Sequence, residues 1–220
     1  MIVAIDGPAG AGKSTVAKIL AKRLGFLYID TGAMYRALTL KALENNVDIS
    51  DEHKINELAL GANIDLRNNP DGTLSVILDG RDVSLDIRQP QITQVVSDVS
   101  KIKGVRQVLV KMQRELGNKG NCVLEGRDIG TVVFPEAQKK FFIDASAKVR
   151  VSRRFKELKV ANQNIAEDDV ARDLSNRDKI DSTREVSPLR KAEDAIYIDT
   201  TELSIEGVVE KMLELCRANG

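Results

Sequence analysis

The sequence contains few of the residues that serve as soft metal ligands or form disulfides. Among its 220 residues are two cysteines, one histidine and no tryptophan. Cys122 and Cys216 fit no metal-ligand spacing, and so few cysteines favour a reducing compartment over a disulfide framework. The single histidine, His53, lies in a polar stretch, so we expect a solvated surface side chain rather than a catalyst.

Net charge and long apolar runs are also lacking. The chain carries 33 basic and 33 acidic residues, so no overall charge favours DNA, RNA or a membrane surface. No apolar run approaches the ~20 residues of a membrane span, and the first apolar stretch is too short for a signal peptide. We therefore expect a cytoplasmic protein without a nucleic-acid polymer or membrane as partner. Any anionic substrate must be met by local arginines.

Short apolar runs alternate with helical patterns along most of the chain. Strands are predicted at 2–5, 26–29, 122–124, 141–143 and 195–198, and helices at about 13–24, 33–45 and 204–217. Buried strands that alternate with helices indicate a parallel sheet covered on both faces. The length fits one compact domain with excursions from this sheet.

Two segments depart from this alternation. Residues 63–83 predict small antiparallel strands at 64–66, 74–78 and Val83, separated by turns at 69–72 and 79–80. The second segment, about 148–184, is dense in charge and poor in β-branched apolar residues. Its arginines are Arg150, Arg153, Arg154, Arg172, Arg177 and Arg184. Solvated helices are the simplest interpretation of this segment.

A complete phosphate-binding motif lies between the first predicted strand and helix. It consists of Gly7, Pro8, Ala9, Gly10, Ala11, Gly12, Lys13 and Ser14. Glycines let the backbone N–H groups surround phosphates, and the helix that follows directs its positive end at the same charge. Lys13 would reach the β- and γ-phosphates, and Ser14 would ligate Mg²⁺. We assign ATP binding to this loop through Thr15.

The loop identifies a phosphate donor but not a reaction. A guanine-reading Asn-Lys-x-Asp motif is lacking, since residues 176–179 do not fit it. Short distances between strands and a supply of arginines instead suggest a kinase whose second substrate is itself a phosphate. A switch protein that binds a nucleoside triphosphate and signals to a partner is the alternative from another class.

Polar residues follow two further strands. Thr31 and Arg36 come after the second strand, and Arg127 and Asp128 come after the third. Ligands of parallel sheets bind at the carboxyl ends of strands, so these side chains are expected near the phosphate loop. A plain surface ion pair is the alternative for Arg127 and Asp128.

Beyond these patterns, the chain resembles the bacterial cytidylate kinases from end to end. The motifs that carry the resemblance are IDGPAGAGKST (5–15), DTGAMYR (30–36), LDGRDVSLDIRQPQIT (78–93), EGRDIGTVVFP (125–135) and RDKIDSTREVSPL (177–189). The resemblance implies an α/β P-loop kinase core with a parallel five-stranded sheet flanked by helices. It also implies a nucleotide-binding insert with a small antiparallel sheet, and a helical lid. The implied reaction uses Mg²⁺ and converts ATP and CMP or dCMP into ADP and CDP or dCDP.

The resemblance also implies roles for single residues. Contacts to the acceptor phosphate are implied for Thr31, Arg36, Arg127 and Arg184. Contacts to the cytosine ring are implied for Ser97, Arg106 and Asp128, and contacts to the sugar for Arg177 and Asp181. Arg153 matches a donor-phosphate arginine, and the catalytic set becomes Lys13, Arg127, Arg153 and Arg184. Glu125 stands where the family also carries Asp, and a magnesium or orienting role stays open.

The implied division of the chain has three parts. The core comprises 1–30, 104–147 and 186–220, the monophosphate-binding region 31–103, and the lid 148–185. An AMP or UMP kinase is the alternative enzyme, against which Ser97, Arg106 and the long insert argue. No apolar surface stripe is left unassigned, so we expect a monomer.

Overall fold

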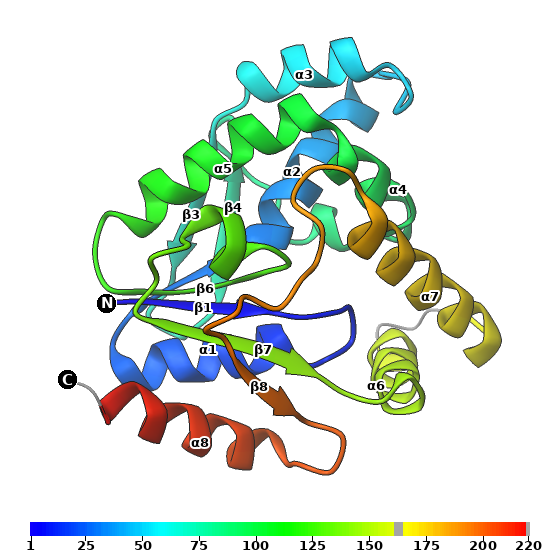
Figure 1. Ribbon diagram of the computed structural model, residues 1–220. Coiled ribbons are helices and arrows are strands. Elements are labelled where there is room, and N and C mark those ends of the chain that lie inside the picture. The colour runs from blue at the N-terminus through cyan, green and yellow to red at the C-terminus, as the bar shows by residue number, and fades with distance from the viewer. Residues whose placement is uncertain (161–164, 219–220) are drawn as a thin grey trace.

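The computed structural model describes residues 1–160 and 165–218 (Figure 1). Its centre is a five-stranded sheet in the order β2-β6-β1-β7-β8, in which all neighbours are parallel. The strands are β1 (Ile2–Asp6), β2 (Leu27–Asp30), β6 (Cys122–Gly126), β7 (Lys139–Asp144) and β8 (Ile196–Asp199). Each lies where the sequence predicts a strand, so the α/β class is confirmed.

Helices cover both faces of this sheet. The α-helices of the described residues are α1 (Lys13–Leu24), α2 (Thr31–Glu44), α3 (Glu52–Leu60), α4 (Pro90–Lys101), α5 (Lys103–Gly117), α6 (Ala147–Val160), α7 (Glu167–Thr183) and α8 (Ile205–Arg217). Val3 and Ile5 of β1 pack in one apolar cluster with α1 and α8, whereas Ala4 packs in the other cluster with α2 and α5. Side chains of a strand alternate between faces, so a strand buried on both faces reads as a continuous apolar run.

The insert after α3 holds a second, antiparallel sheet. Its strands are β3 (Ile64–Asn68), β4 (Leu74–Leu78) and β5 (Arg81–Asp82), in that order. Asp79 and Gly80, with φ of 50° and 87°, form the two-residue turn that the sequence predicts. The last predicted strand, at Val83, is shifted: β5 ends at Asp82. The N–H of Val83 still donates to the Val76 carbonyl at 2.9 Å, so the pairing extends one residue past the strand.

The charged segment forms α6 and α7, which lie beyond the carboxyl ends of the central strands (Figure 1). Val170 and Leu174 of α7 pack on Ala9 of the phosphate loop, and no residue of α6 is buried. The predicted helices are present, but they are only partly solvated, because α7 has a buried face. Residues 161–164, inside the proposed lid, lie outside the described residues.

The scarce residue types behave as the sequence predicts. The His53 side chain is 83% exposed, and both cysteines are buried free thiols. Across 1–160 and 165–218, each helix is too short or too polar to cross a membrane.

Gly7 is the position at which the fold most directly constrains the phosphate loop. Its φ is 150°, and a Cβ there would lie 1.9 Å from the Ile143 carbonyl oxygen of β7. We expect Gly7→Ala to lower the free energy of unfolding by about 2–5 kcal/mol, because it combines backbone strain with a steric clash. Urea unfolding measures this loss.

Gly120→Ala is the matched control, because a Cβ at Gly120 meets nothing within 4 Å. We expect its stability to stay within about 0.5 kcal/mol of the native protein. Equal stability of both variants would show that β7 does not constrain the loop at Gly7.

Candidate active site

The phosphate loop connects β1 to the first turn of α1. Gly10 and Gly12 have φ of 75° and 90°, in the left-handed region that glycine adopts without strain. Lys13 is 6% exposed, and its Nζ donates to the Pro8 carbonyl at 2.7 Å. Burial lowers the pKa of Lys13, and the nearby Arg127 guanidinium lowers it further. The loop therefore combines a glycine-rich backbone with one buried lysine.

Glu125, at the end of β6, connects this loop to the sheet. Its Oε2 accepts from the Ser14 hydroxyl at 2.9 Å, and its Oε1 accepts from the Tyr28 hydroxyl. Burial raises the pKa of Glu125, and the neighbouring Asp30 raises it further. A hydroxyl that donates its proton to a carboxylate keeps its lone pairs for a cation. The arrangement therefore fits Ser14 as a ligand of a hard divalent cation such as Mg²⁺.

A cavity opens over the loop. Its lining includes six of the predicted ATP-binding residues: Ala9, Gly10, Gly12, Lys13, Ser14 and Thr15. Gly7, Pro8 and Ala11 support the loop without lining this cavity. Arg153 also stays outside it, since its guanidinium donates to the Thr200 hydroxyl at 2.9 Å and to the Thr200 carbonyl at 2.6 Å. Its neighbour Arg154 lines the cavity instead.

A second cavity lies beside the first, between α2, α4, α5, α7 and the segment after β6. All nine residues that the sequence assigns to the acceptor nucleotide line it: Thr31, Arg36, Ser97, Arg106, Arg127, Asp128, Arg177, Asp181 and Arg184. They come from α2, α4, α5, α7 and the segment after β6. The fold thus gathers positions that span most of the chain.

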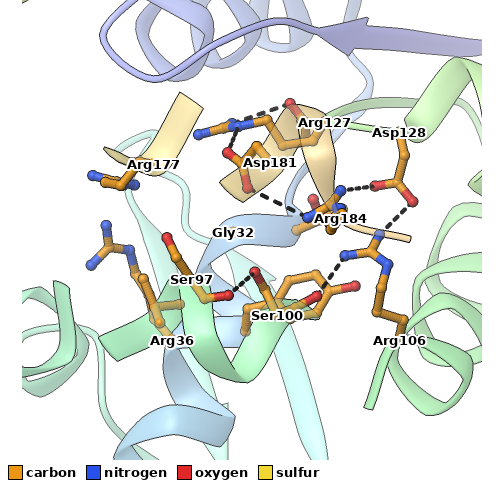
Figure 2. A pocket seen from close by; sticks show the side chains of 14 residues that line it. Gly32, Arg36, Ser97, Ser100, Arg106, Arg127, Asp128, Arg177, Asp181 and Arg184 are labelled. Carbon is orange, nitrogen blue, oxygen red and sulfur yellow. Dashed lines mark hydrogen bonds and ion pairs between the residues drawn. The ribbon is translucent and has the colours of Figure 1, made fainter. Parts of the chain in front are cut away.

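A chain of ion pairs runs through this second cavity (Figure 2). Arg106 contacts Asp128 at 2.5 Å, and Arg184 contacts the other oxygen of Asp128 at 3.7 Å. Arg184 also contacts Asp181 at 3.4 Å, and Asp181 accepts from Arg127 Nε at 2.8 Å. Arg127 therefore pairs with Asp181 of α7, not with the adjacent Asp128. The alternative of a surface Arg127–Asp128 pair is wrong.

The charge of the cavity is positive overall. Five arginines and two aspartates line it. Burial lowers the pKa of Arg36 to about 10, with Arg177 lowering it further, and burial also lowers the pKa of Arg177 and Arg184. Arg177 Nε and Arg184 Nη2 are buried without a hydrogen-bond acceptor. Such a site fits a ligand that brings several anionic oxygens.

The two cavities share part of their lining. Arg36, Arg127 and Arg177 border both of them, together with Gly32 and Gly126. Three guanidinium groups therefore stand where the phosphate of one ligand would meet the phosphate of the other. Arginine stabilises charge on a transferring phosphoryl group by the same paired N–H donors that bind phosphate.

Several contributors to the site escape sequence reasoning. Tyr28 holds Glu125, Thr93 accepts from Arg36 at 2.9 Å, and the Ser100 carbonyl accepts from Arg106 at 3.0 Å. The Arg106 guanidinium lies over the Tyr35 ring, 5.4 Å from its centroid. The sequence holds no signal that distinguishes Arg154 from Arg153 as a residue of the donor cavity.

A phosphate loop that adjoins an arginine-rich cavity at the carboxyl edge of a parallel sheet defines a P-loop kinase. Solved structures agree on the fold. An uncharacterized protein from Eubacterium ventriosum matches with a TM-score of 0.54 at 13% identity, covering 100% of this chain and 99% of that one. A gluconokinase from Sinorhizobium meliloti matches with a TM-score of 0.50 at 13% identity, covering 98% and 91%.

The family follows from more similar sequences. The family model described as Cytidylate kinase matches residues 3–218. A cytidylate kinase of Carboxydothermus hydrogenoformans is 52% identical over 98% of this chain and 96% of its own length. Those of Caldanaerobacter subterraneus subsp. tengcongensis and Bacillus subtilis are 54% and 50% identical, over 99% and 96% of this chain and 95% and 94% of their own lengths. The chain belongs to the cytidylate kinase family.

Asp181 is the carboxylate that keeps Arg127 and Arg184 paired. Burial alone would raise the pKa of Asp181, but these arginines hold it below its usual value. We expect Asp181→Asn to lower the free energy of unfolding by about 3–5 kcal/mol, because two buried cations lose their partner. A depressed pKa stabilises the fold above the unfolded pKa of about 3.9, so the difference from the native protein should shrink as pH falls below that value.

Thermal unfolding with and without inorganic phosphate measures this effect. Phosphate should raise the melting temperature of Asp181→Asn more than that of the native protein, since it supplies the missing anion. Asp173→Asn is the control, because Asp173 on the same helix is 40% exposed and lies 3.8 Å from Arg177. Equal phosphate effects in all three proteins would contradict the assignment of Asp181 as the central counter-ion.

Proposed function

We propose that this protein transfers the γ-phosphoryl group of ATP to CMP or dCMP, giving ADP and CDP or dCDP, in pyrimidine nucleotide metabolism in the cytoplasm. One observation carries the proposal above all. The nine residues assigned to the acceptor line one cavity, and this cavity adjoins the phosphate loop at three arginines. Membership of the cytidylate kinase family supports the same reaction.

The proposed base site discriminates by hydrogen-bond polarity. Cytosine presents an amino donor beside a ring nitrogen and a carbonyl oxygen, which are acceptors. The Asp128 carboxylate accepts from the amine, and Ser97 and Arg106 donate to the acceptors. Uracil carries a carbonyl in place of the amine and would face Asp128 unfavourably. Arg106 and Asp128 line the same cavity and contact each other at 2.5 Å, which supports a role for both at one base.

The other residues of the cavity bind the sugar and the phosphate of the acceptor. Asp181 accepts from a pentose hydroxyl, and Arg177 packs beside it. The acceptor phosphate binds to Thr31, Arg36, Arg127 and Arg184. Arg184 Nη2 is buried without a hydrogen-bond acceptor, and this supports the assignment because a phosphate oxygen would supply one.

At the donor site, Lys13 and the loop N–H groups bind the β- and γ-phosphates. The Ser14 hydroxyl, which donates a hydrogen bond to Glu125, would hold Mg²⁺, and the bound ion would neutralise charge on the ATP phosphates. Lys13, Arg127, Arg153 and Arg184 form the proposed catalytic set, and Arg154 joins it because it lines the donor cavity. Transfer depends on positioning and charge stabilisation, with no covalent enzyme intermediate.

We infer three functional parts. Residues 1–30, 104–147 and 186–220 form the rigid core, and residues 31–103 bind the monophosphate. The third part, 148–185, closes over both substrates and excludes water. The absence of buried residues in α6 supports a segment that moves against the core. The protein is proposed to act as a monomer, on nucleotides rather than on nucleic acid or at a membrane.

A coupled assay with ATP, Mg²⁺ and each common nucleoside monophosphate tests the proposal. CMP and dCMP should be the best acceptors. Asp128→Asn should lower kcat/KM for CMP about 10- to 100-fold and for UMP much less, because it weakens a hydrogen bond to a charged group.

The matched control is Asp98→Asn, an exposed carboxylate of α4 whose side chain is 43% accessible. It should leave the acceptor preference unchanged. A better rate with UMP or AMP would replace the substrate assignment, and ADP formation that ignores the acceptor would favour the switch protein.

A further inference from the structure

Asp6 is a buried carboxylate to which the proposed reaction assigns no role. It is the last residue of β1, directly before the phosphate loop, and is 4% exposed. β1 pairs with both β6 and β7, where Asp6 lies opposite Gly126 and Phe142. The backbone of Asp6 is therefore fixed at the centre of the sheet.

Both oxygens of Asp6 accept backbone hydrogen bonds from the segment after β6. Oδ1 accepts from the N–H of Ile129 at 2.8 Å, and Oδ2 accepts from the N–H of Gly130 at 2.7 Å. These residues open a single π-helical turn, η2 (Ile129–Val133). The first N–H groups of a helical turn have no acceptor within it. Asp6 therefore caps η2 from a different strand.

The capping contact bears on the residue before the turn. Asp128 occupies the N-cap position, where an aspartate ordinarily turns its carboxylate back onto the free N–H groups. Asp128 makes no such bond. Its carboxylate instead contacts Arg106 at 2.5 Å and Arg184 at 3.7 Å inside the acceptor cavity (Figure 2). Because Asp6 satisfies the N–H groups, the Asp128 carboxylate is available to the cavity.

A contribution to stability does not explain why position 6 carries a carboxylate. Asp6 forms no ion pair within residues 1–160 and 165–218. Burial raises the pKa of Asp6 to about 6, although the two N–H groups lower it. Burial of this charge costs free energy that a neutral side chain would not, and the attraction of Lys13 offsets only part of that cost. Only an ionised carboxylate of this size, however, offers an acceptor oxygen to each of two adjacent N–H groups.

We propose that Asp6 is a positioning residue for base recognition, which caps η2 in place of Asp128 and so keeps the Asp128 carboxylate directed at the base. The inference rests on the proposed function, in which Asp128 accepts from the amino group of cytosine. It also fixes the base-reading carboxylate to the strand that carries the phosphate loop. One side chain then fixes the position of the base site relative to the phosphate loop.

Asp6→Asn tests the role. The amide has one oxygen, so its NH₂ group would face one of the two N–H donors, and Asp128 would turn to cap the turn itself. We expect the ratio of kcat/KM for CMP over UMP to fall about tenfold, comparable to the loss of one hydrogen bond to a charged group. Most of the change should lie in the KM for CMP.

The double variant separates positioning from general damage. In an Asp128→Asn background, Asp6→Asn should cause no further fall in the CMP-to-UMP ratio, because its effect passes through Asp128. Val133→Ala is the matched control: it removes buried apolar volume from the same turn, where Val133 is 1% exposed, and leaves the cap in place. It should lower the melting temperature without changing the ratio.

Each outcome bears on the inference. A native enzyme that prefers CMP and an Asp6→Asn variant with the same preference would overturn the role of Asp6 and leave the proposed function intact. A native enzyme without preference for CMP over UMP would overturn the proposed function, and the role of Asp6 with it. Asp6→Ala, which avoids the clash of the amide, carries the same test where Asp6→Asn does not fold. Failure of both variants to fold would assign Asp6 to stability and overturn the proposal.

Discussion

Mutual repulsion among buried arginines is the constraint around which this structure is organised. Five guanidinium groups line the acceptor cavity of a chain whose acidic and basic residues balance overall. Four of the five have a specific partner: Arg106 contacts Asp128 and the Ser100 carbonyl, Arg127 and Arg184 contact Asp181, and Arg36 contacts Thr93. The partners are too few to neutralise the charge, because only two aspartates are among them. The cavity is therefore built to be completed by an anion.

Such a cluster is held from several directions. The end of β6 supplies the segment with Arg127 and Asp128, and α7 brings Asp181 across from the charged segment. Since removal of either carboxylate would leave arginines buried without a partner, the pairs depend on one another. The contact of α7 with the phosphate loop extends this dependence. Asp178, which follows Arg177 in the sequence, accepts a hydrogen bond from the Ala9 N–H at 3.3 Å. The phosphate loop and the acceptor cavity thus both contact α7.

Sequence reasoning recovered the parts of the protein that depend on local pattern. Buried apolar runs located all five central strands, and the glycines and lysine of residues 7–14 located the phosphate loop. The nine acceptor positions came from resemblance to a family, and the fold gathers them in one cavity. Which arginine pairs with which aspartate in the cavity could not be predicted. Arg127 and Asp128 are adjacent in sequence, yet Arg127 pairs with a residue 54 positions away. Both residues lie past the end of β6, so their orientation is set by packing of the loop and not by strand alternation.

Residues that act by positioning a neighbouring side chain are equally hard to predict from sequence. Tyr28 carries no motif, and it matters because strand register puts its hydroxyl against Glu125, on the next strand of the sheet. Arg153 and Arg154 are indistinguishable as sequence, but one faces Thr200 and the other faces the donor cavity, since a helix turns about 100° between successive residues. In each case the decisive quantity is an orientation set by packing. A motif names the groups that meet a ligand, whereas the fold decides which unmarked side chains hold those groups still. Pre-organisation of this kind matters most where phosphoryl transfer depends on placement rather than on a reactive protein group.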